Sequence, residues 1–193
     1  MPNKTEKQKM LAGELYDSRD PELLEQYHKA KSLLATYNSL DSRNLKEREL
    51  ILNELFAKKG EGVWIEAPFF CDYGENIEIG ANTFINTNCI FLDDNLIKIG
   101  KNGLIAPMVQ IYTARHPIKA SDRIYQNADQ TRYHTSSKPV LIGDNVWIGG
   151  NALIFPGVTI GNNVTIGAGS VVTKDLPNDV LALGNPCQVI RNL

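Results

Sequence analysis

The chain has 193 residues, which is enough for one large domain or for a domain with a small appendage. Its formal net charge of −2 gives no general attraction for nucleic acid or anionic lipid. Cys71, Cys89 and Cys187 are odd in number and widely spaced, so they predict neither a disulfide framework nor a Cys-x-x-Cys metal site. The N-terminus lacks an apolar signal core, and no apolar run approaches the roughly 18 residues of a membrane span. We therefore expect a soluble, cytoplasmic protein.

Residues 1–60 are predicted to be helical. Asp20 and Pro21 suit the N-cap and the first turn of a helix. Apolar residues follow them at helical spacing, namely Leu23, Leu24, Tyr27, Ala30, Leu34 and Tyr37. A second helix is predicted from about Ser42 to Lys59, ending at Gly60. We expect this segment to form a helical cap on one end of the domain that follows.

From about residue 61 onward, aliphatic residues return every six positions. The clearest run is Ile142, Ile148, Ile154, Ile160, Ile166 and Val172. A period of six fits neither the 3.6 residues of an α-helix turn nor a simple two-residue alternation. It fits a chain that turns a corner every six residues and sends one aliphatic side chain per flat run toward a shared axis. This predicts a mainly β fold, a parallel β-helix whose coils stack on their neighbours.

The same repeat occurs upstream and slips once. Ile79, Ile85, Phe91 and Ile97 keep the spacing, and Ile99, Ile105 and Ile111 resume it two residues out of phase. The repeat is absent from residues 112–139, a stretch that is rich in polar residues and too long for a corner, so we predict an excursion loop there. The predicted β-helix domain covers residues 61–193 and ends in a tail over about 184–193.

One of the three histidines stands out as a candidate for chemistry. His28 lies in the first predicted helix and is expected at the surface, and His134 lies in the polar loop without a nearby partner. His116 lies where the chain leaves the solenoid wall, and Pro117 restricts its backbone direction.

Several segments resemble a known family. They are Ala12-Gly13-Glu14-Leu15-Tyr16, Cys71-Asp72-Tyr73-Gly74, Leu92-Asp93-Asp94, His116-Pro117-Ile118, Ile148-Gly149-Gly150, Pro156-Gly157-Val158-Thr159-Ile160-Gly161 and Gly184-Asn185-Pro186-Cys187. Together they resemble the maltose/galactoside O-acetyltransferases, which belong to the hexapeptide-repeat acyltransferases. The first two segments favour the maltose branch, and the resemblance covers about residues 6–193.

The resemblance implies a left-handed β-helix, a homotrimer with active sites between subunits, and direct acetyl transfer from acetyl-coenzyme A to a sugar hydroxyl. The acceptor would be of the maltose, glucose or galactoside type. His116 matches the catalytic histidine of the family. A neutral imidazole can take the proton of an alcohol as its oxygen attacks the thioester. The reaction would need no metal and no covalent intermediate on the enzyme.

The resemblance also assigns binding residues. The acceptor positions fall on Asp17, Asp72, Asn86 and Asp94, whose carboxylates and amides can bind several sugar hydroxyls in fixed directions. The positions for acetyl-coenzyme A fall on Gly150, Ala168, Thr173, Lys174 and Arg191. Of these, Lys174 and Arg191 would supply positive charge for the coenzyme phosphates.

Three other functions are compatible with parts of the pattern. A zinc enzyme resembling the γ-class carbonic anhydrases would need several converging histidines, and only His116 is available. A non-catalytic solenoid scaffold would need no base at all. An acetyltransferase could also act on an amine or another non-sugar acceptor, since Asp72 and Asp94 could hold a cation as well as a polyol.

Overall fold

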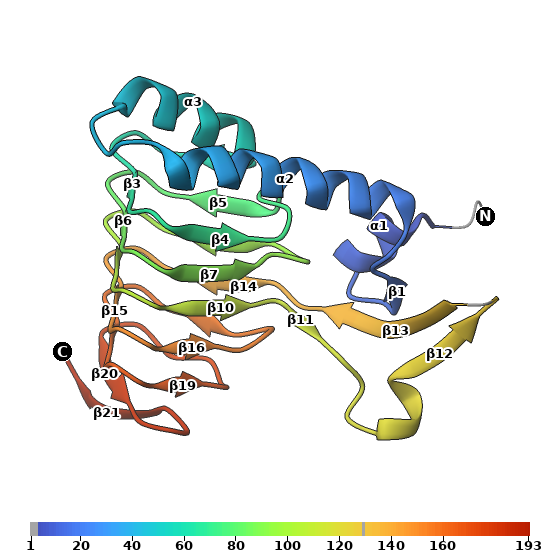
Figure 1. The fold of residues 1–193 in the computed structure, drawn as a ribbon. Helices are drawn as coiled ribbons and strands as arrows, with labels where there is room; N and C mark the ends of the chain where they lie inside the picture. The colour runs from blue at the N-terminus through green and yellow to red at the C-terminus, as the bar shows by residue number, and fades with distance from the viewer. Residues whose placement is uncertain (1–3, 129) are drawn as a thin grey trace.

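A computed structural model describes residues 4–128 and 130–193. Its main body is a three-sided prism of stacked coils, with helices across one end and an arm that projects from one side (Figure 1). The period of six predicted from the sequence is confirmed, because each short run forms one strand of a parallel sheet that extends from coil to coil. No helix within the described ranges is long and apolar enough to cross a membrane.

The prism has three walls, which we name after one of their strands. The β10 wall consists of β4 (Phe69–Cys71), β7 (Cys89–Leu92), β10 (Gln110–Tyr112), β16 (Leu153–Ile154) and β19 (Val171–Val172). The β14 wall consists of β2 (Lys58–Lys59), β5 (Ile77–Ile79), β8 (Ile97–Ile99), β14 (Val140–Ile142) and β17 (Thr159–Ile160). The β15 wall consists of β3 (Trp64–Ile65), β6 (Phe84–Ile85), β9 (Leu104–Ile105), β15 (Trp147–Ile148), β18 (Thr165–Ile166), β20 (Val180–Leu183) and β21 (Gln188–Asn192).

The aliphatic repeat fills the axis of the prism. In the β15 wall the chain of paired residues is Ile65, Ile85, Ile105, Ile148 and Ile166, and all of them are buried. Burying an aliphatic side chain of this size stabilises the fold by roughly 1.5–3 kcal/mol. Each coil therefore contributes its own share of the core, and the coils keep one register along the axis.

The phase slip marks one edge of the prism. Where the chain passes from the β10 wall to the β14 wall, eight positions separate Cys71 from Ile79 and Phe91 from Ile99 instead of six. The next passage, from Ile111 to Ile142, contains the excursion. We call this the broad edge, formed by residues 72–76, 93–96 and 113–139. Further along the axis the same edge is tight, with only six positions between Ile154 and Ile160.

Three helices precede the coils, and the two longer ones lie across the first of them (Figure 1). They are α1 (Glu6–Leu11), α2 (Pro21–Ser39) and α3 (Leu45–Leu55). Asp20 caps α2 by accepting the Glu22 N–H at 3.0 Å, as its place before Pro21 predicts. The prediction that the second helix continues to Lys59 is wrong, because α3 ends at Leu55. Phe56 leaves the helix to pack edge-on against Phe69 in the core, and β2 then pairs with the exposed side of β5.

The excursion over 112–139 has secondary structure of its own. It contains β11 (Ala114–Arg115), the 3₁₀ turn η1 (Ala120–Asp122), β12 (Ile124–Asn127) and β13 (Gln130–Ser137). Strands β12 and β13 form an antiparallel hairpin, and β13 also pairs with β11 and with β1 (Tyr16–Asp17) near the N-terminus. Figure 1 shows this arm beside α1 and β1, clear of the prism. The N-terminal segment thus holds the arm in place by backbone hydrogen bonds.

Asparagines stabilise another edge of the prism. Asn82, Asn102, Asn145 and Asn163 all have positive φ, a left-handed conformation that asparagine tolerates better than most residues. Their side chains form a ladder from coil to coil, with Asn102 donating to Asn145 at 3.0 Å and Asn145 donating to Asn163 at 2.9 Å. Each of these asparagines follows a glycine by two positions, and the ladder explains why this Gly-X-Asn pattern recurs at the same edge in successive coils.

Replacing Asn145 with alanine is expected to lower the free energy of unfolding by about 2–3 kcal/mol. Alanine is strained in the left-handed backbone conformation of this position, and the two ladder hydrogen bonds of Asn145 are lost. Asn151→Ala is the matched control. Asn151 has φ of 57°, close to the 58° of Asn145, and its side chain makes no hydrogen bond within the described residues. Urea unfolding should therefore show a smaller loss of about 1–2 kcal/mol for the control. Equal losses would show that the ladder contributes nothing.

Candidate active site

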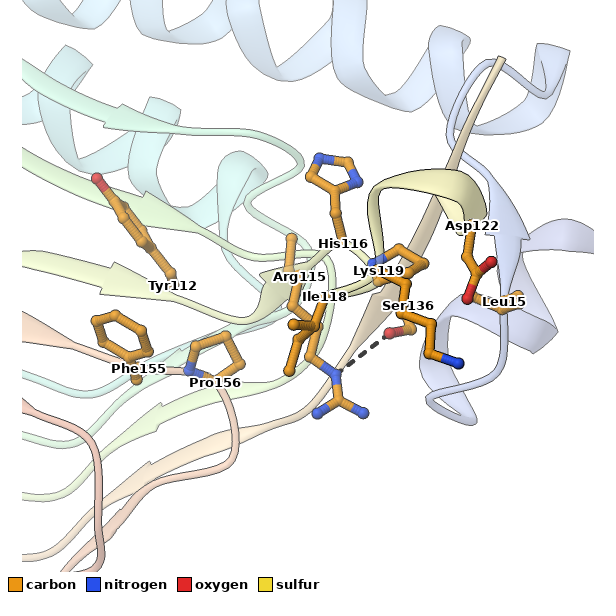
Figure 2. A pocket seen from close by; sticks show the side chains of 12 residues that line it. Leu15, Tyr112, Arg115, His116, Ile118, Lys119, Asp122, Ser136, Phe155 and Pro156 are labelled. Atoms are coloured by element: carbon orange, nitrogen blue, oxygen red, sulfur yellow. Dashed lines mark hydrogen bonds between the residues drawn. The ribbon is translucent and has the colours of Figure 1, made fainter. Parts of the chain in front are cut away.

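His116 lies on the broad edge, directly after β11. Its Nδ1 atom is 2.9 Å from the carbonyl oxygen of His134 on β13. A carbonyl can only accept, so Nδ1 carries a hydrogen, and in the neutral imidazole Nε2 then has the free lone pair. Figure 2 shows the ring projecting away from the side chains of Arg115 and Ile118. The backbone thus presents an imidazole whose tautomer and direction are both fixed.

The prediction that His134 has no nearby partner is wrong. Its carbonyl accepts the His116 hydrogen bond, its own Nδ1 is 2.8 Å from the Asp122 carbonyl, and its ring stacks on Tyr125 at 4.4 Å between centroids. These contacts could not be predicted from the sequence, because they depend on the pairing of β12 with β13. His28, by contrast, is exposed on α2 as expected.

A cavity of about 710 Å³ opens beside His116. Its apolar wall comes from successive positions on the β10 wall and the broad edge, with Tyr112 above Phe155 and Pro156 (Figure 2). The arm supplies the opposite side through the segment 114–119. This cavity is large enough for an extended ligand, and residues of two neighbouring coils line it.

A second, smaller pocket of about 220 Å³ contains two carboxylates. It is lined by Ser18, Leu24, Tyr27, Asp72, Tyr73 and Asp94. Burial raises the pKa of Asp94 to about 6, although the Tyr16 hydroxyl donates a hydrogen bond to this carboxylate and lowers the pKa in part. His116 is close enough for its charge to lower the same pKa. The His116 imidazole therefore lies near the acidic pocket, although it does not line it.

Asp93, next to Asp94, holds the loop that carries Asp72. Its Oδ1 atom accepts the N–H groups of Asp72 at 2.9 Å and Tyr73 at 2.8 Å, and its side chain is completely buried. Burial raises the pKa of Asp93 to about 8, in spite of these two hydrogen bonds. Asp93 therefore stabilises the loop that carries Asp72 and Tyr73, but it does not itself line the pocket.

Lys31 on α2 neutralises Asp72. The Lys31 ammonium lies 3.1 Å from Asp72 Oδ1 and 2.6 Å from the Cys71 carbonyl, and it also sits 4.6 Å from the centre of the Tyr27 ring. The cap helix thus contributes one wall of the acidic pocket. Within the described residues, Asp94 forms no ion pair and accepts a hydrogen bond from the Tyr16 hydroxyl instead.

The other predicted acceptor residues lie apart from this pocket. Asp17 forms an ion pair with Arg132 at 3.2 Å, while its neighbour Ser18 lines the pocket. Asn86 follows β6, at the edge where the chain passes from the β15 wall to the β10 wall, and its Oδ1 accepts the Thr87 N–H at 2.8 Å. We call this second edge the narrow edge.

The predicted coenzyme residues divide between the two edges and the last strand. Gly150 and Ala168 follow β15 and β18 on the narrow edge, where the Gly150 carbonyl accepts the Gly169 N–H of the next coil at 2.8 Å. Thr173 and Lys174 are exposed on the broad edge, one coil beyond Phe155. Arg191 is exposed on β21. Within the described part of the chain, no group of three or more His, Cys, Asp or Glu side chains is placed to hold a metal ion.

Known proteins match this chain over nearly its whole length. Residues 9–60 match the maltose acetyltransferase hexapeptide capping motif, and residues 139–174 match the hexapeptide repeat of succinyl-transferase. The galactoside O-acetyltransferase of Escherichia coli K12 is 40% identical over 186 residues, which cover 96% of this chain and 88% of that protein. This chain belongs to the maltose/galactoside O-acetyltransferase family. It is an acetyltransferase with the left-handed β-helix of the hexapeptide-repeat proteins.

Solved structures of related proteins share the fold over nearly the whole chain. The structure of a maltose O-acetyltransferase from Clostridium difficile 630 is 48% identical, covers 98% of both chains and superposes with a TM-score of 0.91. A hexapeptide-repeat acetyltransferase from Vibrio cholerae O1 biovar eltor, solved as a complex with acetyl-coenzyme A, is 39% identical. It covers 98% of this chain and 99% of its own, with a TM-score of 0.86.

Asp93→Asn is expected to flatten the dependence of stability on pH. The folded pKa of about 8 lies above the ordinary 3.8, so the folded protein keeps a proton that the unfolded chain releases between these values. The resulting stabilisation is complete below about pH 4 and disappears as the pH rises through about 8. Urea unfolding of both proteins at several pH values in this window measures the effect. An unchanged pH slope in the variant would contradict the raised pKa.

Proposed function

We propose that this acetyltransferase transfers the acetyl group of acetyl-coenzyme A to a hydroxyl of a sugar of the maltose, glucose or galactoside type, with His116 as the general base. The observation that carries the proposal is the fixed His116 imidazole, held through Nδ1 beside a pocket of hydrogen-bonding side chains. Two of the relatives are named galactoside O-acetyltransferase and maltose O-acetyltransferase, which supports an acceptor of the same class here.

In the proposed mechanism, His116 Nε2 accepts the proton of the acceptor hydroxyl as the hydroxyl oxygen attacks the thioester carbonyl. The His134 carbonyl holds Nδ1–H throughout, so the imidazolium that forms stays oriented. The carbon–sulfur bond then breaks, and His116 returns the proton to the leaving thiolate. A thiolate is a good leaving group, so no covalent intermediate on the enzyme is required.

The acidic pocket suits a neutral polyol. We propose that Asp72 and Asp94 accept hydrogen bonds from sugar hydroxyls, with Ser18 or Asp17 and Asn86 as further contacts. Since Lys31 already neutralises Asp72, the pocket has less net negative charge to attract a cationic amine than two free carboxylates would have. Tyr27 and Leu24 add an apolar wall that a sugar ring can cover.

The proposed coenzyme contacts require two chains. Gly150, Ala168 and the acceptor residue Asn86 lie on the narrow edge, whereas His116, Thr173 and Lys174 lie on the broad edge. Within one chain these two edges lie at different corners of the prism and cannot meet. The broad edge of one chain can, however, face the narrow edge of a neighbouring chain. We therefore place the site between subunits of a homotrimer, with Lys174 and Arg191 near the coenzyme phosphates.

An apolar stripe on the outer face of the β15 wall supports this assembly. Trp64, Phe84, Leu104 and Trp147 are paired in register from coil to coil, and Leu104 and Trp147 are 53% and 54% exposed. Contiguous exposed apolar side chains of this kind mark contact surfaces. The three free cysteines suit a reducing compartment, so we place the enzyme in the cytoplasm.

His116→Ala is expected to reduce turnover by about 10²–10⁴-fold, the usual contribution of a positioned base, with the affinity for acetyl-coenzyme A retained. The release of coenzyme A with maltose as acceptor measures turnover, and calorimetric titration measures binding. His28→Ala, which changes an exposed histidine outside the site, is the matched control and should keep full activity. Turnover by His116→Ala at the rate of the control would refute the assignment of the base.

Leu104→Glu is expected to convert the trimer to monomers and to abolish activity, because it puts a charge in the middle of the apolar stripe. Analytical ultracentrifugation measures the mass, and circular dichroism checks that each chain remains folded. Leu50→Glu, on the exposed face of α3, is the control and should leave the trimer intact. Full activity of a monomeric Leu104→Glu protein would contradict a site shared between subunits.

A further inference from the structure

Arg123 binds the backbone on both sides of the His116 hydrogen bond, although its side chain lies outside the cavity. On one side, its Nε donates to the Pro117 carbonyl at 2.8 Å and its Nη2 donates to the Ile118 carbonyl at 2.5 Å. These are the two residues that follow His116. A single guanidinium thus fixes the path by which the chain leaves the histidine.

On the other side, the backbone of Arg123 holds the acceptor strand. The Arg123 carbonyl accepts the N–H of His134 at 2.8 Å, just before β12 and β13 begin to pair at Ile124 and Tyr133. The peptide unit of His134 is therefore bound through its N–H to Arg123 and through its carbonyl to His116. Arg123 therefore holds both partners of the hydrogen bond between His116 Nδ1 and the His134 carbonyl. Its side chain binds the segment after His116, and its backbone binds His134.

We propose that Arg123 is a positioning residue that sets the tautomer and the direction of the His116 imidazole. This inference rests on the proposed role of His116 as general base. Arg123 acts through backbone carbonyls and does not line the cavity, so it determines how the base is oriented. Since a misplacement of about 1 Å can cost about 10²-fold in rate, a loosened exit segment is expected to slow the chemical step.

The guanidinium is the group that this arrangement requires. It is planar, permanently charged and offers its donors in a fixed fork, so one side chain can bind two successive carbonyls in set directions. A lysine ammonium carries the same charge as a single point on a flexible stem and cannot define both directions. Arg123→Lys therefore keeps the positive charge but loses the paired hydrogen bonds to the Pro117 and Ile118 carbonyls. This makes it the decisive variant.

In steady-state kinetics, Arg123→Lys and Arg123→Gln are expected to lower kcat by about 10- to 100-fold, with the KM for acetyl-coenzyme A changed by less than about twofold. Arg43→Lys is the matched control, since Arg43 is an exposed arginine on the cap with a carboxylate partner, Asp41. It should behave as the unmodified protein. Thermal unfolding of each variant checks that the fold is retained.

The tautomer supplies a readout that is independent of turnover. In ¹⁵N-histidine NMR spectra, with signals identified by His116→Gln, the unmodified protein should show His116 with hydrogen on Nδ1. Arg123→Lys should shift this signal toward a mixture of tautomers. A folded Arg123→Lys protein that keeps both kcat and the Nδ1–H signal would overturn the proposal. If His116→Ala keeps its turnover, the proposed base fails instead, whatever the tautomer spectra show.

Discussion

The hydrogen bond from His116 Nδ1 to the His134 carbonyl determines what chemistry the site can perform. A carbonyl accepts only, so this contact places the hydrogen on Nδ1 and leaves Nε2 free to take a proton. Two distant parts of the chain are needed to form it. The coils hold His116 at the end of β11, and β1 and β12 hold His134 on β13 from both sides.

The broad edge explains why the polar site lies where it does. On the other edges, short corners follow the six-residue repeat, and several of them turn at an asparagine or glycine with positive φ. On the broad edge, two extra residues per coil allow Asp72 and Asp94 to turn toward the pocket, and the arm departs one coil later. The helical cap closes this region from above through Lys31 and Tyr27. Toward the C-terminus the same edge becomes tight; Phe155 and Pro156 line the cavity there, and Thr173 and Lys174 are exposed one coil further on.

Much of this architecture could be predicted from the sequence, because a repeat records the same packing constraint many times. The inward positions from Ile79 to Val172 follow directly from the period of six. The phase slip between Ile97 and Ile99 was visible too, and it marks the broad edge. The division into a cap over 1–60 and a β-helix domain over 61–193 stays a prediction. The end of α3 was missed, since Phe56 leaves the helix for a core contact that no local propensity encodes.

The site was less predictable than the fold. His116 was identified from its place at the exit and from the family resemblance, but its partner is a backbone carbonyl, which carries no residue signature. The roles of Asp93 and Arg123 depend on backbone groups that meet only after folding. Asp17 and Ser18 are adjacent in sequence, and only the direction of each side chain separates the ion-paired residue from the one that lines the pocket.

The central claim is that one imidazole, fixed through Nδ1, removes a proton from a neutral hydroxyl held by the acidic pocket. A competition for acetyl-coenzyme A between equal concentrations of maltose and glucosamine tests it most directly, with the products identified by mass spectrometry and NMR. The account predicts that O-acetylmaltose dominates among the products. Predominant formation of N-acetylglucosamine would contradict it.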